Sequence, residues 1–166
     1  MKVLFTGSFD PVTTGHLSLI TRAASLFDEV VCTVFNNAEK THFLSAEQRL
    51  LLLRAAVAHL PNVTCDLSCG YVADYAKKNG IHAIIRGIRN GSDLAYEREM
   101  ADYNKRHSGV ETILLPAESG MEEVSSSLLR RLISEGRSTE GLLPDAARAV
   151  LADLGISSSA AVKEEI

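Results

Sequence analysis

The fold class is decided by residues 3–16, VLFTGSFDPVTTGH, in which a short apolar run gives way to glycine, serine, aspartate and proline. Residues 3–5 are typical of a buried strand, and Asp10-Pro11 is typical of a turn. Beyond the turn, residues 17–27 carry apolar side chains at helical spacing. The stretch therefore predicts a strand, a loop and a helix in immediate succession.

The same alternation continues through the chain. Further strands are predicted at residues 30–35, 62–66, 83–85 and 112–115, and further helices at 45–60, 72–79, 93–106, 125–132 and 146–154. A strand followed by a helix, repeated along the chain, predicts a single-domain, Rossmann-like α/β fold: an open parallel five-stranded sheet with helices on both faces. The domain is expected to span residues 1–155, and residues 156–166 are expected to form a polar, flexible tail.

Composition narrows the class of protein. The 166 residues carry a net charge of -4 and no long basic run, which disfavours a nucleic-acid partner. No apolar run approaches the ~20 residues that span a bilayer, and the N-terminus lacks a signal-peptide pattern, so no membrane partner and a cytoplasmic location are expected. The three cysteines lack paired CxxC spacing, which favours reduced thiols.

The loop after the first predicted strand is a candidate phosphate site. Ligands of such sheets bind beyond the carboxyl ends of the strands, and a helix start offers free N–H groups to an anion. Gly7 and Gly15 permit close approach of the backbone, and Ser8 and His16 add polar side chains. The alternative is an Asp-Pro turn followed by a threonine-capped helix with His16 exposed. Neither GxGxxG nor GxxxxGK[ST] is present.

Residues 7–16 resemble the N-terminal signature of nucleotidyltransferases that carry a (H/T)xGH motif. Three later segments, RGIR at 86–89, YE at 96–97 and SSSLL at 125–129, narrow the resemblance to the phosphopantetheine adenylyltransferases, over residues 3 to 154. The resemblance implies transfer of AMP from ATP to 4'-phosphopantetheine, giving dephospho-coenzyme A and pyrophosphate in the penultimate step of coenzyme A synthesis. It also implies Mg²⁺ bound with ATP, coenzyme A as a related ligand, and a homohexamer.

The resemblance assigns roles to individual residues. The catalytic residues are His16, Lys40 and Arg89. The ATP-binding residues are Ser8, Phe9, His16, Gly87, Ile88, Arg89, Glu97, Met121, Glu122, Glu123, Val124, Ser125, Ser126 and Ser127. The acceptor-binding residues are Ser8, Lys40, Val72 and Arg86. The acceptor phosphate is already anionic, so catalysis should come from positioning and charge stabilisation without a protein base or a protein metal ligand.

Several of these residues have simpler explanations. Lys40 could be solvated, Val72 could be core packing, and the triple serine could be an ordinary N-cap. The two arginines could form surface ion pairs, since Asp93, Glu97 and Glu99 lie close in sequence. Glu97 could belong to a solvated helix face.

The resemblance departs at residues 121–124, MEEV, where the family has a more aromatic stretch. Met121 can still pack against a base, but two adjacent acids near a triphosphate are unfavourable unless they point away or meet Mg²⁺. Two other functions stay open. One is a related transferase that acts on nicotinamide mononucleotide or a phospho-alcohol, and the other is a non-catalytic nucleotide sensor.

Overall fold

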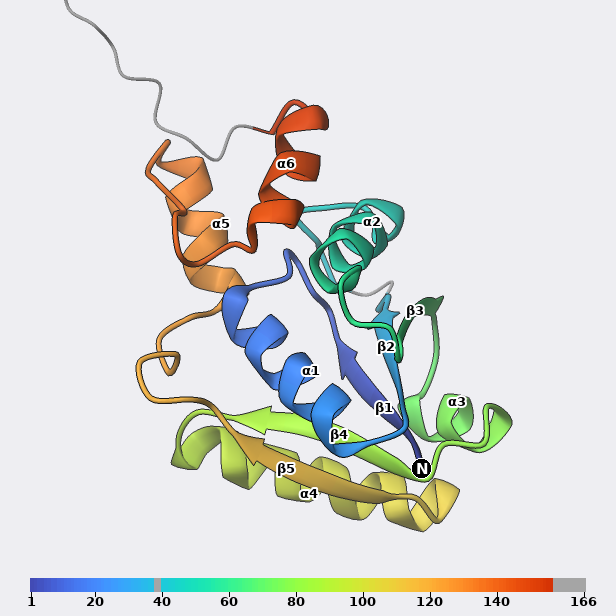
Figure 1. The fold of residues 1–166 in the computed structure, drawn as a ribbon. Coiled ribbons are helices and arrows are strands. Elements are labelled where there is room, and N and C mark those ends of the chain that lie inside the picture. Colours follow the sequence, from blue (N-terminus) through green and yellow to red (C-terminus); the bar gives the residue numbers. More distant parts are fainter. Residues whose placement is uncertain (38–39, 157–166) are drawn as a thin grey trace, which may run out of the picture.

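A computed structural model describes residues 1–37 and 40–156, and this part of the chain forms five strands and six helices (Figure 1). In chain order they are β1 (Lys2–Gly7), α1 (Thr14–Leu26), β2 (Glu29–Phe35), α2 (Ala46–Val57), β3 (Val63–Ser68), α3 (Val72–Lys78), β4 (Ala83–Ile88), α4 (Gly91–Ser108), β5 (Glu111–Pro116), α5 (Ser126–Ser134) and α6 (Asp145–Asp153). Ile156 packs against the core, and the rest of the tail predicted at 156–166 lies outside the described residues. Within the described ranges, no helix is long and apolar enough to cross a membrane.

The sheet is parallel throughout and has the strand order β3-β2-β1-β4-β5. The central strand β1 pairs with β2 on one side and with β4 on the other, so that Val3 lies opposite both Val30 and Ala83. The chain winds outward from β1 in one direction and from β4 in the other. The carboxyl ends of these two strands therefore flank the crevice where ligands of open parallel sheets bind.

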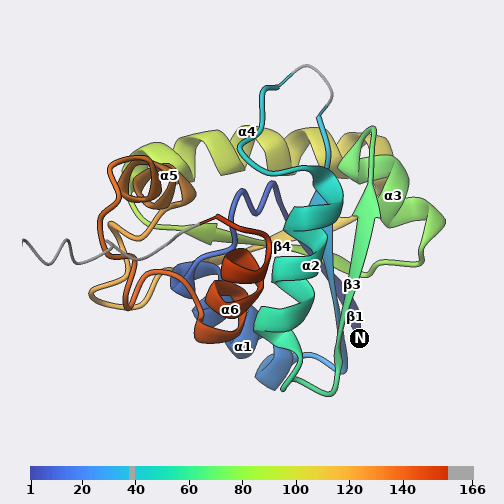
Figure 2. The same ribbon diagram turned by 90° about the horizontal axis from the view of Figure 1, so that it is seen from above.

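Helices cover both faces of the sheet, which confirms the predicted fold class (Figure 2). On one face, α1, α2 and α6 bury Ile20, Leu53 and Leu151 against the sheet in the larger apolar cluster. On the other face, α3 and α4 cover a smaller cluster that includes Leu4 and Ile84. Successive strand residues point to opposite faces, so each inner strand supplies both clusters.

Strand β4 is longer than the sequence predicts, and the extension places two site residues inside the sheet. It runs to Ile88 because the pairing with β5 continues as far as Pro116. By alternation Arg86 points to the face covered by α4, and Gly87 points to α1. A Cβ on Gly87 would lie 2.3 Å from Cδ1 of Leu19, so glycine is what allows α1 to pack this closely.

Candidate active site

Two cavities open at the carboxyl ends of β1 and β4. The first has a volume of about 410 Å³ and is lined mainly by residues of β1, α1, β4 and the segment around the start of α5. The second, of about 320 Å³, is lined mainly by β1, β4, α4 and the segment after β2. Both are lined by Thr6, Gly7, Ser8, Arg86 and Glu97. The two cavities therefore meet along one shared edge, formed by the carboxyl ends of β1 and β4, by Ser8 and by Glu97 of α4.

His16 lies in the first turn of α1 and lines the first cavity. Thr13 caps the helix: its Oγ1 accepts from the His16 N–H at 3.1 Å, and its own N–H donates to Nδ1 of His16 at 3.1 Å. The cap predicted as an alternative to a phosphate site is thus present, but His16 is partly buried. Burial, followed by the charges of Arg86 and Arg89, lowers its pKa from 6.5 to about 4. Because Nδ1 accepts a backbone N–H, the neutral ring carries its proton on Nε2.

The loop after β1 approaches the cavities with its backbone because Phe9 is folded inward. Phe9 as a whole residue is 1% exposed, and its ring lies edge-on to His16 with 5.1 Å between centroids. A Cβ on Gly7 would lie 3.2 Å from this ring, which is a tight contact, so a glycine at this position leaves room for the ring. Phe9 itself has φ 46°, in the left-handed region that few non-glycine residues adopt. The exposed part of this loop is therefore Ser8, and both Ser8 and the buried Phe9 line the first cavity.

Arg86 is held rigidly at the shared edge. Its Nε and Nη2 donate to the two carboxylate oxygens of Glu97 at 2.8 and 2.6 Å, and Nη1 donates to O and Oγ1 of Thr6 at 2.6 and 2.8 Å. These contacts use four of the five N–H groups of the guanidinium and leave one for a ligand. Glu97 is buried and pairs bidentately with Arg86, so it does not belong to a solvated helix face.

Arg89 follows β4 and faces the first cavity. Its Nε donates to Asp93 at 2.9 Å, and its backbone N–H donates to the same carboxylate at 3.1 Å. The ion pair holds the pKa of Asp93 below its usual range and raises that of Arg89. Each arginine thus forms an ion pair with one of the nearby acids, Arg86 with the buried Glu97 and Arg89 with Asp93, yet all four residues line the first cavity.

The triple serine begins α5 beside the first cavity. Ser125 caps the helix by accepting from the Leu128 N–H, and the Ser126 hydroxyl donates to the Pro11 carbonyl at 2.7 Å. The N-cap given as the simpler explanation is therefore present, and the capped helix start also lines the cavity. Arg130, which the sequence analysis missed, donates to the Asp10 carbonyl at 2.7 Å and lines the same cavity. The signal was available, since Arg130 lies one turn beyond the serines.

The two acids of residues 121–124 are exposed and do not line the first cavity. Met121 and Val124 line the first cavity, and Val124 is buried against Gly15. Glu122 is exposed and accepts from the Gly120 N–H at 2.7 Å, and Glu123 is exposed. Of the residues assigned to ATP, Ile88, Glu122 and Glu123 line neither cavity.

The second cavity contains the predicted acceptor residues and a helix face that the sequence analysis did not identify. Lys40, which is exposed, and Val72 line it. The cavity is also lined by Tyr96, Met100, Ala101 and Asn104 of α4. Together with Glu97, these residues lie three or four positions apart and therefore share one face of the helix. Glu97 and Asn104, the buried residues of α4, lie on this face and show that it is turned towards the protein interior.

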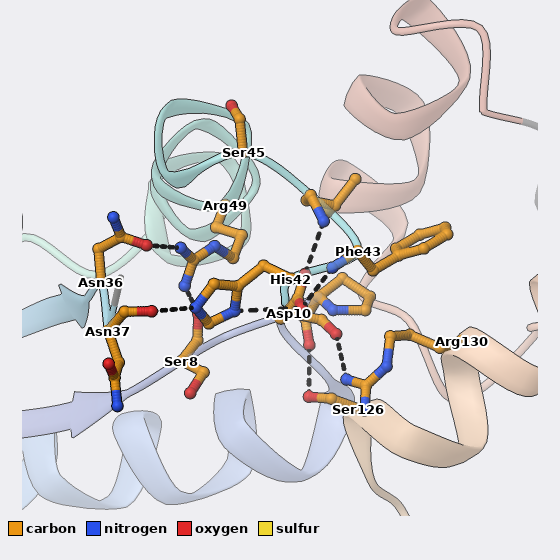
Figure 3. Close-up of polar contacts among 12 residues, drawn as sticks. Ser8, Asp10, Asn36, Asn37, His42, Phe43, Ser45, Arg49, Ser126 and Arg130 are labelled. Atoms are coloured by element: carbon orange, nitrogen blue, oxygen red, sulfur yellow. Dashed lines mark hydrogen bonds and ion pairs between the residues drawn. The ribbon is translucent and has the colours of Figure 1, made fainter. Parts of the chain in front are cut away.

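Figure 3 shows how the loop after β1 is joined to the segment after β2. The buried carboxylate of Asp10 accepts from the N–H groups of Phe43 and Leu44 at 2.8 and 2.9 Å, and Nδ1 of His42 lies 3.5 Å from it. Neither Asp10 nor His42 was assigned a role from the sequence, because their partners are about 30 residues away. The contacts fix the segment that includes Lys40 relative to Ser8.

Comparisons with known proteins bear on the same residues. A sequence profile described as cytidylyltransferase-like matches residues 4–132, a range that includes every residue lining either cavity. A phosphopantetheine adenylyltransferase of Cutibacterium acnes is 44% identical over 144 residues, which are 87% of this chain and 92% of that protein. The protein of that name from Deinococcus radiodurans is 40% identical over 153 residues, which are 91% of this chain and 92% of that protein. The one from Symbiobacterium thermophilum is 42% identical over 145 residues, which are 87% of this chain and 90% of that protein.

Proposed function

The chain belongs to the phosphopantetheine adenylyltransferase family, and we propose that its two cavities bind the two substrates of this family's reaction. The enzyme transfers the adenylyl group of ATP to 4'-phosphopantetheine, giving dephospho-coenzyme A and pyrophosphate in coenzyme A synthesis. The observation that carries the placement of the substrates is the shared edge, because a two-substrate transfer requires both reacting phosphates at one place.

ATP occupies the first cavity in this proposal. The start of α5 with its three serines, the guanidinium groups of Arg89 and Arg130, and the first turn of α1 all face this cavity. Free N–H groups of a helix start and arginine forks both suit phosphate oxygens. The exposed acids Glu122 and Glu123 do not line this cavity, although the charge of Glu123 acts on Arg89.

4'-Phosphopantetheine occupies the second cavity, with its phosphate towards the shared edge. Lys40 supplies an exposed cation that lines the cavity, and Arg86 supplies a fixed one with a single free N–H. The apolar lining by Val72, Met100 and Ala101 suits the uncharged arm of the substrate. Glu97 then acts on both substrates through Arg86, in place of the direct contact with ATP that the sequence suggested.

The chemical step is an in-line displacement without a covalent intermediate. A phosphate oxygen of 4'-phosphopantetheine forms a bond to the α-phosphorus of ATP, the bond from that phosphorus to the bridging oxygen breaks, and pyrophosphate leaves with the electron pair. The nucleophile is already anionic, so the protein stabilises charge and needs no base.

His16 acts in this step as a neutral hydrogen-bond donor. Its low pKa keeps the ring uncharged at neutral pH, and the Thr13 N–H holds Nδ1 as an acceptor. The proton on Nε2 is therefore available to an oxygen of the transferring phosphate. A preorganised donor of this kind stabilises the charge that develops in the transition state.

Mg²⁺ enters with ATP in this proposal, as part of the substrate. The described residues include no group of three or more His, Cys, Asp or Glu arranged to hold a metal ion, and Asp93 and Glu97 are already paired with arginines. The phosphate oxygens of ATP and water, which Mg²⁺ prefers to keep, would supply its ligands.

We also propose a homohexamer located in the cytoplasm, with dephospho-coenzyme A and coenzyme A as further ligands of the second cavity. These features are implied by the family resemblance of the sequence. Light scattering coupled to size-exclusion chromatography measures the number of subunits directly, and a monomeric mass would contradict the hexamer.

An acceptor panel tests the proposed function. Pyrophosphate release is measured with Mg·ATP and 4'-phosphopantetheine, nicotinamide mononucleotide or a phospho-alcohol, and CTP and GTP replace ATP to test the segment at residues 121–124. Turnover with another acceptor but not with phosphopantetheine would contradict the proposal. Thermal stabilisation by ATP without pyrophosphate release from any acceptor would indicate a nucleotide sensor.

A further inference from the structure

Arg49 is fully buried, with 0% of its surface exposed, and its guanidinium group contacts the loop that follows β1. It lies in the first turn of α2, on the same face as the buried residues Leu52, Leu53, Ala56 and Val57. Their spacing of three, four, seven and eight residues is that of a core-facing stripe. Arg49 therefore occupies a position where an apolar side chain would normally pack.

The charge of Arg49 is costly at this position. Burial lowers its pKa, its Nε has no hydrogen-bond partner among the described residues, and the start of α2 presents the positive end of the helix dipole. It forms no ion pair with a carboxylate of the described residues, although Asp10 and Glu47 favour its charge from a distance. An apolar side chain would avoid this cost, so stability alone does not account for an arginine here.

The contacts of Arg49 are both to the ligand-facing loops (Figure 3). Nη1 donates to the Ser8 carbonyl at 2.9 Å, and Nη2 donates to Oδ1 of Asn36 at 2.6 Å. The Ser8–Phe9 peptide is trans, so its C=O and N–H point in opposite directions. Holding the carbonyl against α2 directs the Phe9 N–H away from α2. No described protein group accepts from this N–H, and both residues of the peptide line the first cavity.

We propose that Arg49 is a positioning residue for adenylyl transfer, which fixes the Ser8–Phe9 peptide so that the Phe9 N–H meets an oxygen of the transferring phosphate. The inference rests on the proposed placement of ATP in the first cavity. Through Asn36, which directly follows β2, Arg49 also ties this peptide to the segment that leads to Lys40. The buried guanidinium adds a fixed positive charge behind the loop, where it favours an anion on the other side.

The test replaces Arg49 in the full-length protein. Arg49→Met removes the charge and both donors but keeps an unbranched side chain that can pack in the core. Arg49→Lys keeps the charge but cannot span both acceptors. Asn36→Ala removes one acceptor and leaves the contact with Ser8. Arg54→Met, on the exposed side of the same helix, is the matched control and should retain wild-type turnover.

Arg49→Met is expected to lower kcat by about 100-fold, with a smaller change in KM for either substrate, because a misplaced donor weakens the transition state more than the ground state. Arg49→Lys should be intermediate, Asn36→Ala should retain most of the turnover, and the melting temperature of Arg49→Met should stay near that of wild type. A kcat of Arg49→Met within twofold of wild type would overturn the inference. So would losses in both Arg49 variants that only follow the fraction unfolded.

Binding of Mg·ATP, measured by calorimetry, separates this inference from the proposed function. If the wild type turns over no acceptor but binds Mg·ATP, the proposed function fails. A weaker affinity of folded Arg49→Met, by about 10-fold for one displaced charge-assisted contact, then still supports the positioning role. An unchanged affinity in that case would overturn it.

Discussion

The two cavities are organised differently, although they share an edge. In the first cavity, polar groups are fixed by partners three or four residues away: Thr13 with His16, Arg89 with Asp93, and Ser125 with Leu128. At the edge that the two cavities share, Arg86 is fixed by Thr6, 80 residues away, and the segment after β2 is held by the contact between Leu44 and Asp10, 34 residues apart. Several side chains of the nucleotide side are therefore oriented by local structure, although Ser126 and Arg130 also join α5 to the loop after β1. The shared edge and the acceptor side depend on contacts that form only once the sheet and the loops have assembled.

The largest expected effect is on the local side of this comparison. His16→Ala should lower kcat by about 10²- to 10³-fold, because it removes a neutral donor held ready for the transition state. The capping contact is lost as well, at a cost of about 1 kcal/mol in the free energy of unfolding. Steady-state pyrophosphate release and urea denaturation measure the two effects.

A matched control for this variant is His82→Ala, which removes an exposed histidine whose ring contacts the backbone of Lys2 at the opposite end of β1. It should leave kcat unchanged. Near-normal turnover of His16→Ala would contradict the proposal that His16 donates a hydrogen bond in the transition state.

Glu97→Gln tests the shared edge. The isosteric amide cannot hold Arg86 in the bidentate ion pair, so kcat/KM for both substrates should fall by about 10-fold or more. Breaking the pair should cost about 1–3 kcal/mol of unfolding free energy, less than for a fully buried pair because Arg86 is partly exposed.

The corresponding control is Glu99→Gln on the exposed side of α4, which should change neither quantity. If Glu97→Gln lowers kcat/KM for ATP but not for 4'-phosphopantetheine, Glu97 acts on the nucleotide directly, as the sequence suggested.

Lys40→Ala tests the acceptor side alone. The loss of one charge-assisted contact should raise KM for 4'-phosphopantetheine by about 10-fold and leave KM for ATP nearly unchanged. Lys77→Ala, on the exposed side of α3, provides the control. An effect confined to ATP would show that the second cavity does not receive the acceptor phosphate.

The smallest expected effect concerns pH. His16 has a folded-state pKa of about 4 against 6.5 unfolded, so the unfolded chain binds this proton first as the pH falls. Its contribution to the free energy of unfolding is present above about pH 6.5 and is lost towards pH 4, and kcat/KM for ATP, which reports the free enzyme, should show no titration of His16 between pH 6.5 and 9.

Urea denaturation at several pH values, compared between wild type and His16→Ala, isolates this contribution from those of other groups. The variant should lose less stability between pH 6.5 and pH 4.5 than the wild type does. Equal losses would indicate that His16 titrates normally in the folded protein.

The sequence predicted most of the fold and much of the first cavity, because the signals are local. Its strand and helix periodicities gave the parallel sheet, and the loop at residues 7–16 indicated a phosphate site at a helix start. The extension of β4 to Ile88 has no local signal in the sequence, because it depends on pairing with β5. Arg49 was missed because a charged residue on a helix is normally taken to be exposed.

By itself the sequence determined the order of strands and helices, the caps at Thr13 and Ser125, and the set of polar residues at the strand ends. Only the tertiary structure decided that Arg86 pairs with Glu97, that Asp10 holds the segment before α2, and that Arg49 is buried against Ser8. Caps and periodicities depend on neighbours within one or two turns of the backbone. Pairings across the sheet depend instead on which strands lie side by side, a choice made by burial of the whole core.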